Sequence, residues 1–239
     1  MSDHDLLRRL EILERDNVRL RRLLDGRGTT AGLRHETRNT LAMVRDVVRR
    51  SAETSGSVED YAAHLEGRLD AVIRIQTAIA NRLQDGVSLH GLVADELTVP
   101  AIGTRERLAI EGPDFLLQPA AAGPLGLAFH ELATNAVKFG TLASPAARID
   151  VTWAVTESEG DRPCLALDWV ESGAPVPPRP ARRGFGTEVI EHMVPYQLGG
   201  HGALAFAPDG IRCSLRLPMT PALGQLRPPP RDAEAGAPA

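Results

Sequence analysis

The residues best suited to chemistry lie in one short run of this 239-residue sequence, between positions 130 and 140. Within the run, Glu131, Asn135 and Lys138 stand four and three residues apart, so a helix would place a carboxylate, an amide and an ammonium on one stripe. Hard oxygen ligands suit Mg²⁺, which keeps several waters and depends on substrate phosphates, while a lysine supplies a point charge to the same phosphates. The run therefore predicts chemistry on a magnesium-bound phosphate.

An apolar stripe beside the polar one indicates where the three side chains would lie. It follows the same spacing one residue over, about 100° around the helix axis. Its members are Leu125, Phe129, Leu132, Ala136 and Phe139. The polar stripe is therefore expected at the edge of the core and not in bulk water. For this run alone, the alternative is an ordinary amphipathic helix whose solvated face carries three polar residues.

A second segment with its own chemistry is Gly184-Phe-Gly186, which Thr187 follows. Glycines let backbone amides approach an anion closely, and Thr187 stands where it could cap the next helix at the positive end of that helix's dipole. A phosphate is the natural ligand for such a segment. The alternative for this segment alone is a tight turn that leads into a helix.

Three segments resemble the sequence boxes of one kinase family. The run that begins at His130 resembles the N box of the histidine-kinase ATPase domain, of the Bergerat or GHKL type, and a histidine before the glutamate is the mark of the HWE subfamily. Trp169-Val-Glu171-Ser-Gly173 is similar to that subfamily's Trp-x-Glu segment, and residues 182–187 resemble its second glycine box. Three boxes in family order over roughly sixty residues are far more specific than a single Gly-x-Gly.

The resemblance implies a role for each residue of the boxes. Asn135 would hold Mg²⁺ on the phosphates of ATP, Glu131 would assist as a second metal ligand or as a base, and Lys138 would counter the phosphate charge. Glu171 would bind the adenine amino group. The phosphate tail would lie in a cradle formed by Gly184, Gly186 and Thr187. The remaining residues assigned to ATP binding are His130, Trp169 and Gly173, and for His130 the sequence gives no task beyond helix packing.

A second chemical centre is His35, which Glu36 follows directly. An imidazole accepts a phosphoryl group only through an unprotonated nitrogen, and the adjacent carboxylate could take up the displaced proton. The segment 33–41 resembles the phosphoacceptor box of histidine kinases, ahead of the ATP boxes as in that family. HWE proteins usually carry an arginine after this histidine, so Glu36 departs from their pattern. On its own, a histidine on a charged helix is usually just solvated.

The composition is that of a globular protein with a real hydrophobic core, since 43% of the residues are hydrophobic and 24% are charged. A formal net charge of -4 argues against general nucleic-acid binding. Cys164 and Cys213 stand far apart without metal-ligand spacing and are expected to be buried free thiols. No apolar run approaches ~20 residues and the charged N-terminus is no signal peptide, so we expect no membrane span and a cytoplasmic protein.

Heptad spacing marks the first segment, residues 1–28. Leucines and one asparagine alternate at steps of four and three, at Leu6, Leu10, Leu13, Asn17, Leu20 and Leu24. This pattern favours a parallel two-stranded coiled coil. A basic DNA-binding zipper is the alternative, but the charges around the heptads are mixed and no basic region precedes them.

Residues 29–86 predict a helical hairpin that carries His35. The second helix of the hairpin should begin at a capping box formed by Ser57 and Asp60. It places residues at heptad steps, namely Leu65, Leu69, Val72, Gln76, Ile79 and Leu83. Two helices cannot enclose a core alone, so the hairpins of two chains are expected to pair into a four-helix bundle, which makes a homodimer.

Residues 87–218 predict an ATP-binding domain. The expected elements are a helix capped by Ser88, a strand at 108–111, the N-box helix from Pro119, strands around 149–153 and 165–169, a helix from Thr187 to about Leu198, and strands around 203–206 and 211–217. Their order predicts an α+β fold in which helices cover one face of a mixed sheet, and the resemblance implies the α/β sandwich of the Bergerat type. Pro195 is expected to end or kink its helix. Residues 219–239 are expected to form a disordered tail.

The resemblance as a whole implies a dimeric HWE-type sensor histidine kinase. Such a protein transfers the γ-phosphoryl group of ATP to His35 and then to an aspartate of a response-regulator receiver domain. We expect its signal to arrive through the coiled coil or from a separate sensor protein. The alternative is a non-enzymatic histidine phosphotransfer module with a degenerate ATP domain, in which the box residues would be lost. A serine kinase of the anti-sigma type would fit the boxes but would leave the hairpin without a purpose.

Overall fold

The structure is a computed structural model that describes residues 37–81, 86–97, 107–138, 146–158, 162–173, 184–208 and 210–227. The chain divides into two compact units between Met43 and Val44, and the sheet, its helices and most of the hairpin lie in the second. The predicted heptads and the predicted phosphoacceptor pair, His35 and Glu36, lie outside the described residues. None of the described helices is long and apolar enough to cross a membrane.

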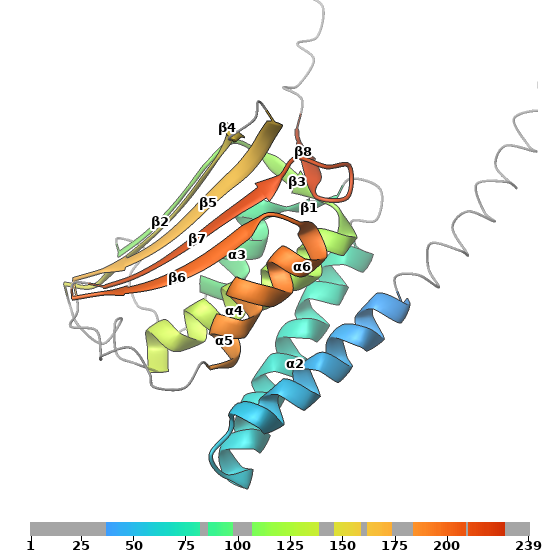
Figure 1. Cartoon of the computed structure of the whole chain (residues 1–239), viewed down its shortest axis with the longest axis vertical. Helices are drawn as coiled ribbons and strands as arrows, with labels where there is room; N and C mark the ends of the chain where they lie inside the picture. The colour runs from blue at the N-terminus through green and yellow to red at the C-terminus, as the bar shows by residue number, and fades with distance from the viewer. Residues whose placement is uncertain are drawn as a thin grey trace, which may run out of the picture. The chain divides into compact units, whose positions relative to one another are not determined.

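A five-stranded sheet forms the centre of the second unit (Figure 1). Its strands are β2 (Leu108–Glu111), β4 (Arg148–Ser158), β5 (Arg162–Ser172), β6 (His201–Ala207) and β7 (Gly210–Pro218). They follow the order β2-β4-β5-β7-β6, in which β2 pairs parallel with β4 and all other pairs are antiparallel. Because side chains alternate along a strand, Leu167, Trp169 and Glu171 of β5 share the buried face.

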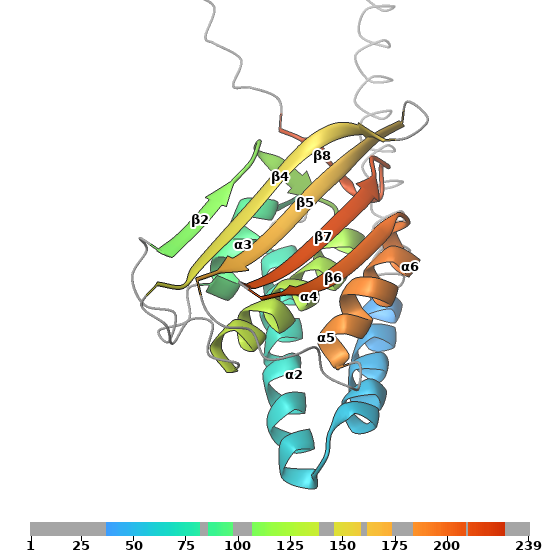
Figure 2. The ribbon, with the colours of Figure 1, turned by 60° about the vertical axis from the view of Figure 1, so that its left-hand side comes forward.

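Helices cover one face of this sheet (Figures 1 and 2). They are α3 (Leu89–Leu97), α4 (Pro119–Lys138) and a continuous helical run made of α5 (Phe185–Glu188), a π-helical segment (Val189–Met193) and α6 (Val194–Leu198). Ser88 caps α3 as predicted, since its hydroxyl oxygen accepts the N–H of Gly91 at 3.2 Å. The observed layers confirm the predicted α+β class, with a mixed sheet covered on one face.

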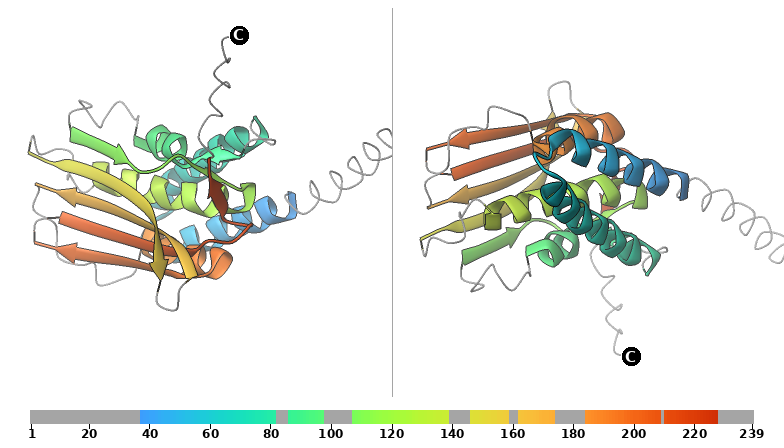
Figure 3. Two further views of the ribbon diagram at one scale, coloured as in Figure 1. Left: turned by 90° about the horizontal axis from the view of Figure 1, so that it is seen from above. Right: turned by 90° about the horizontal axis from the view of Figure 1, so that it is seen from below.

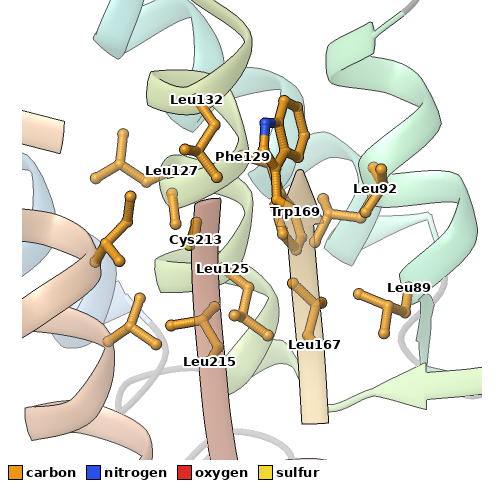
Figure 4. Close-up of a cluster of buried hydrophobic side chains, with 14 of the residues drawn as sticks. Leu89, Leu92, Leu125, Leu127, Phe129, Leu132, Leu167, Trp169, Cys213 and Leu215 are labelled. Carbon is orange, nitrogen blue, oxygen red and sulfur yellow. The ribbon is translucent and has the colours of Figure 1, made fainter. Parts of the chain in front are cut away.

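The core lies between α4 and the buried face of the sheet (Figure 4). Leu125, Phe129 and Leu132 of α4 lie in one buried cluster with Trp169 of β5 and Leu215 of β7. Each large apolar side chain buried in this way contributes roughly 1.5–3 kcal/mol relative to exposure. The predicted apolar stripe therefore fixes the rotation of α4 about its axis, and with it the direction of the neighbouring polar stripe.

A second, small sheet was not predicted. It places β3 (Phe115–Leu117) between β1 (Val87–Ser88) and β8 (Gly224–Leu226), both antiparallel to it. Strand β8 lies inside the segment 219–239, so the prediction of a disordered tail was wrong for residues 219–227. Leu223 anchors this part of the chain, because its side chain is buried in the core cluster. Gly224 has a φ of 144°, and a Cβ there would lie 2.1 Å from the carbonyl oxygen of Leu116.

The helical hairpin consists of a helix at residues 37–54, of which residues 44–54 belong to the second unit, and α2 (Val58–Ala80). Ser57 caps α2 as predicted, because its hydroxyl oxygen accepts the N–H of Asp60 at 3.0 Å. α2 packs against α4, as the right-hand view in Figure 3 shows from below. Ile75 and Ile79 of α2 belong to the same buried cluster as Phe129 of α4.

The predicted boundary at residue 86 therefore does not separate two cores. Ile79 and Leu65, which the heptad spacing assigned to a bundle between two chains, contact the core of the ATP-binding region instead. Gly126 of α4 permits this packing, because a Cβ at that position would lie 2.6 Å from Cδ1 of Ile75. The structure describes a single chain, and the four-helix bundle of a dimer stays a prediction.

Pro195 was predicted to end or kink its helix, and it does not end the helix. The helix continues to Leu198 because the preceding segment adopts π-helical geometry, in which the N–H of Val194 donates to the carbonyl of Val189 five residues earlier. Pro195 then falls in the first turn of α6, where a missing N–H costs little. A single π-helical turn within an α-helix gives no period that a sequence pattern could reveal.

Candidate functional site

The N-box stripe runs from the core to the surface along α4. Glu131 is buried, Asn135 is partly buried and Lys138 is exposed. The gradient follows from the tilt of the apolar stripe, which buries Leu132 and Ala136 beside them. The expectation that the polar stripe lies at the edge of the core is confirmed, and the three side chains border one cavity.

The glycine box meets the N box directly. Gly184 is the N-cap residue of α5, with an extended backbone (φ -79°, ψ 172°) and no side-chain cap hydrogen bond. A Cβ on Gly186 would lie 3.2 Å from Nδ2 of Asn135 and 3.2 Å from Cβ of Glu131. Any larger residue at this position would therefore press on the N box. Thr187 is not a cap as predicted, because the helix already begins at Phe185, whose ring is buried.

The Trp-x-Glu segment lies on β5 with both side chains toward the core. Trp169 has no solvent exposure and packs among the core residues shown in Figure 4. Its indole N–H donates to Oε1 of Glu171 at 3.1 Å. Glu171 is 1% exposed and borders the cavity, which Trp169 does not. Trp169, predicted as an ATP-binding residue, can therefore influence a ligand in the cavity only by orienting Glu171.

Gly173 ends β5 with a backbone that favours glycine. Its φ is +78°, and a Cβ would lie 2.2 Å from the carbonyl oxygen of Ala146. It does not border the cavity that the other box residues share. Its contribution among the described residues is to let the chain turn at the end of the strand that carries Glu171.

The cavity that these boxes share has a volume of about 340 Å³. Of the residues predicted from the sequence, it is bordered by His130, Glu131, Asn135, Lys138, Glu171, Gly184, Gly186 and Thr187. The hairpin supplies part of the wall through Thr54, His64, Gly67 and Arg68, none of which was predicted to belong to the site. The site is therefore built from three regions that are far apart in the sequence.

Arg68 of α2 holds the carboxylate of Glu131. Its Nε donates to Oε1 at 2.8 Å and its Nη2 donates to Oε2 at 3.1 Å, so both carboxylate oxygens are engaged. Its Nη1 donates to Oγ of Ser51 at 2.8 Å, and its guanidinium lies 3.9 Å from the ring centroid of Phe185. A bidentate, buried pair of this kind is geometrically specific and strong.

His130 of α4, which borders the cavity, also belongs to a polar cluster with α2 and α3. Its Nδ1 lies 2.9 Å from Oε2 of Glu96 on α3, and Nη2 of Arg74 on α2 donates to both oxygens of the same carboxylate at 3.0 and 3.1 Å. Burial alone would raise the pKa of Glu96, but the hydrogen bond and charge of His130, with the charge of Arg74, outweigh it and lower the pKa below its usual value. Glu96 is therefore an anion that joins three helices.

His64 of α2 lies beside Lys138, with 2.8 Å between Nε2 of the imidazole and Nζ of the lysine. Burial lowers the pKa of His64, and the nearby charges of Lys138 and Arg68 lower it further. His64 is therefore neutral near pH 7, and its Nε2 accepts a hydrogen bond from the ammonium. This histidine lies outside the three boxes, and its place at the cavity was not predicted.

The residues of the cavity fit a magnesium-bound phosphate compound. The carboxylate of Glu131 and the amide oxygen of Asn135 are hard oxygen donors, and Gly186 leaves space beside them that a Cβ would fill. No group of three or more His, Cys, Asp or Glu side chains among the described residues could hold a metal ion by itself. A cation held at this place by Glu131 and Asn135 would need further ligands from the phosphates.

Comparison with known proteins shows what this chain is similar to. Residues 32–114 match the model of the HWE histidine kinases. The chain is 33% identical to a blue-light-activated histidine kinase of Rhizobium johnstonii over 211 residues, which are 88% of this chain and 56% of that protein. The chain is therefore similar to the HWE histidine kinases. Two of the three boxes that resemble the HWE pattern border the cavity through several residues each.

Two further histidine kinases are similar to this chain. The chain is 29% identical to a blue-light-activated histidine kinase of Brucella ovis over 187 residues, which are 78% of this chain and 38% of that protein. It thus spans about half the length, or less, of these curated relatives. Among solved structures, it is similar to the blue-light activated histidine kinase of Erythrobacter litoralis EL346, with a TM-score of 0.49 and 16% identity over 77% of this chain and 63% of that chain.

The residues that sequence reasoning missed at this site come mainly from the hairpin. Arg68, His64 and Arg74 stand in α2, where they look like the ordinary charged face of an amphipathic helix. Glu96 stands among apolar residues near the end of α3, and a buried carboxylate requires a partner. That requirement was the only signal in the sequence, and it could not name His130 or Arg74 as the partners.

Proposed function

We propose that this chain transfers the γ-phosphoryl group of ATP to His35 and then passes it to an aspartate of a response-regulator receiver domain. The observation that carries the proposal is the convergence of the N box and the glycine box on one cavity. The two boxes meet at Gly186, whose backbone lies against Asn135 and Glu131. Glu171 borders the same cavity from the sheet.

In this proposal each box residue has one task at the nucleotide. Asn135 orients the phosphates through the metal ion, Glu131 assists as metal ligand or base, and Lys138 neutralises phosphate charge. Bound magnesium would supply positive charge to the phosphates and ATP would supply the phosphoryl group. Glu171 accepts a hydrogen bond from the adenine amino group, with its carboxylate oriented by the indole of Trp169.

The proposed reaction exchanges one bond to phosphorus for another. An unprotonated ring nitrogen of His35 forms a bond to the γ-phosphorus, while the bond from that phosphorus to the oxygen bridging the β- and γ-phosphates breaks. ADP leaves with the electron pair of that bond, and Glu36 accepts the proton that the imidazole loses. The phosphoryl group then moves from nitrogen to a carboxylate oxygen of the receiver's aspartate. We also propose a homodimer, and the cytoplasmic location predicted from the sequence stays a prediction.

The experiment that tests the proposal is labelling of the full chain with γ-labelled ATP and Mg²⁺. A phosphohistidine is labile in acid and stable in base, so the label should be lost on acid treatment. His35→Gln should remove the label, whereas His201→Gln, an exposed change on β6 far from the boxes in sequence, should leave it unchanged. Labelling that persists in His35→Gln would refute the assigned phosphoacceptor.

The same experiment separates the kinase from a phosphotransfer module. A module of that kind would accept phosphate from a phosphorylated receiver without any use of ATP. Wild-type protein that neither binds nucleotide nor labels itself, yet accepts phosphate from a receiver, would overturn the proposed kinase. The N-box and glycine-box residues that were predicted to bind ATP all border the cavity, which supports the kinase.

A further inference from the structure

Three ion pairs join the described hairpin to the ATP-binding region, and all three have the same polarity. In each, the arginine is on the hairpin and the glutamate on the region that carries the boxes: Arg50–Glu188, Arg68–Glu131 and Arg74–Glu96. Glu131 belongs to the N-box helix, and Glu188 follows the glycine box in α5. The hairpin is therefore attached to both elements that form the candidate phosphate site.

The pair at Glu131 is the most enclosed of the three. The side chains of Arg68 and Glu131 are 8% and 7% exposed, whereas the arginine of the Arg74–Glu96 pair is 49% exposed. Arg68 is held on all sides by Glu131, by the hydroxyl of Ser51 and by the ring of Phe185. Its guanidinium could contact an added ligand only after these contacts rearrange.

Glu131 would have to share its charge between Arg68 and a metal ion. Each of its carboxylate oxygens accepts one N–H group from the guanidinium, which leaves a second lone pair on each oxygen. A divalent cation on one of those lone pairs would stand within a few ångströms of another full positive charge in a buried site. Occupation of Glu131 by a cation from the nucleotide therefore weakens the attachment of Arg68.

We propose that Arg68 and magnesium compete for Glu131, so that docking of the hairpin and binding of a magnesium nucleotide weaken each other. The inference rests on the proposed function, because it concerns the regulation of that same site. Release of Arg68 also removes the cation over Phe185, the first residue of the glycine-box helix. Undocking of the hairpin thus frees the N box and loosens the glycine box in one event.

A distance measurement on the full chain tests the competition. Spin labels can be attached at Ile73→Cys on α2 and Tyr196→Cys on α6, because both side chains are exposed, at 62% and 91%. Cys164 and Cys213 are buried, and burial raises the pKa of Cys213 to about 12, so neither natural thiol should react. Magnesium with a non-hydrolysable ATP analogue should lengthen and broaden the distance distribution. The analogue with EDTA, or magnesium alone, should leave it unchanged.

A binding measurement tests the role of Arg68 itself. Arg68→Met should lower the Kd for the magnesium form of the analogue about tenfold, a usual size for coupling between two ligands. The Kd measured in EDTA should change little. Arg49→Met is the matched control, because Arg49 is an exposed arginine of the same hairpin whose ion-pair partner among the described residues is Glu53. It should leave both values unchanged.

A second variant covers the case in which Arg68→Met does not fold. Arg68→Lys keeps the charge but cannot form the bidentate contact, so it should lower the Kd for the magnesium form by a smaller factor. A Kd that is unchanged or raised in the variants that fold, or label distances that do not change although the analogue is bound, would overturn the competition. Failure of the wild type to bind nucleotide at all would instead refute the proposed function.

Discussion

Glu131 and Asn135 stand one helical turn apart on α4, yet their surroundings give them different freedom. Glu131 is buried against Arg68, and a buried carboxylate keeps its charge only with such a partner. Asn135 is neutral and partly buried at the cavity, where it borders Gly186. At the scale of single residues, the polar stripe predicted from spacing is therefore correct. The partner of Glu131 comes from α2, and the spacing of residues within α4 could not predict where that helix packs.

The first residue-scale prediction concerns Asn135→Ala. The change should abolish binding of the magnesium nucleotide and self-labelling, because the oxygen donor is lost, while the free energy of unfolding should change by less than about 1 kcal/mol. Isothermal titration and thermal denaturation measure the two effects. Val137→Ala, on the exposed face of the same helix, is the control and should bind nucleotide as the wild type does. Transfer of phosphate from a phosphorylated receiver to His35 should survive in Asn135→Ala, and its loss would count against the assignment.

The second residue-scale prediction concerns Glu96, whose pKa is lowered in the fold. A lowered pKa stabilises the fold fully above the usual value of ~4.3, and this stabilisation is lost as the pH falls through the lowered value. Glu96→Gln should reduce the free energy of unfolding at pH 7 by about 1–3 kcal/mol.

As the pH falls below about 5, Glu96→Gln should lose less stability than the wild type, because the variant has no carboxylate to protonate at position 96. Asp95→Asn, an exposed neighbour on α3, is the control. Denaturant unfolding at a series of pH values measures both. Parallel pH profiles of Glu96→Gln and wild type would show that Glu96 does not carry this charge.

At the scale of elements, the helices and long strands could be predicted because each carries its own signal. Ser57, Ser88 and Pro119 mark helix starts, and alternating residues mark β4 and β5. The strands β1, β3 and β8 have two or three residues each, too few to show a period. The π-helical segment likewise depends on a local hydrogen-bond shift that no residue type specifies.

The element-scale prediction concerns the crossing of α2 and α4. Gly126 is unfavourable inside a helix by about 1 kcal/mol relative to alanine. Because its Cβ would lie 2.6 Å from Cδ1 and 2.8 Å from Cγ1 of Ile75, Gly126→Ala should nevertheless destabilise the fold by about 1–2 kcal/mol.

Removal of the Ile75 side chain should reverse that sign. In an Ile75→Ala background, Gly126→Ala should stabilise the fold by up to about 1 kcal/mol, because the clash is gone and the gain in helix propensity remains. The four proteins of this double-mutant cycle can be compared by denaturant unfolding. Equal effects of Gly126→Ala in both backgrounds would mean that α2 does not approach α4 at this glycine.

At the scale of the whole molecule, the arrangement of hairpin and sheet was the part that the sequence could not predict. The heptad spacing of α2 shows that one face is apolar, but an apolar face can be buried by a second chain or by another part of the same chain. In the structure, α4 covers Ile75 and Ile79. The choice depends on the three Arg–Glu pairs and on Gly126, and the glutamates and Gly126 all lie outside the hairpin in sequence.

The whole-molecule prediction concerns how the chain would dimerise. If the apolar face of α2 is buried against α4, a dimer has to form through the heptads of residues 1–28, which are outside the described residues. Leu13→Glu, at a heptad core position, should then convert the dimer to a monomer, because a buried charge without a partner is costly. Ile73→Glu, at an exposed position of α2, should leave the dimer intact. Light scattering of the full chains distinguishes these results, and the opposite pattern, with Ile73→Glu monomeric and Leu13→Glu dimeric, would show that α2 forms the interface after all.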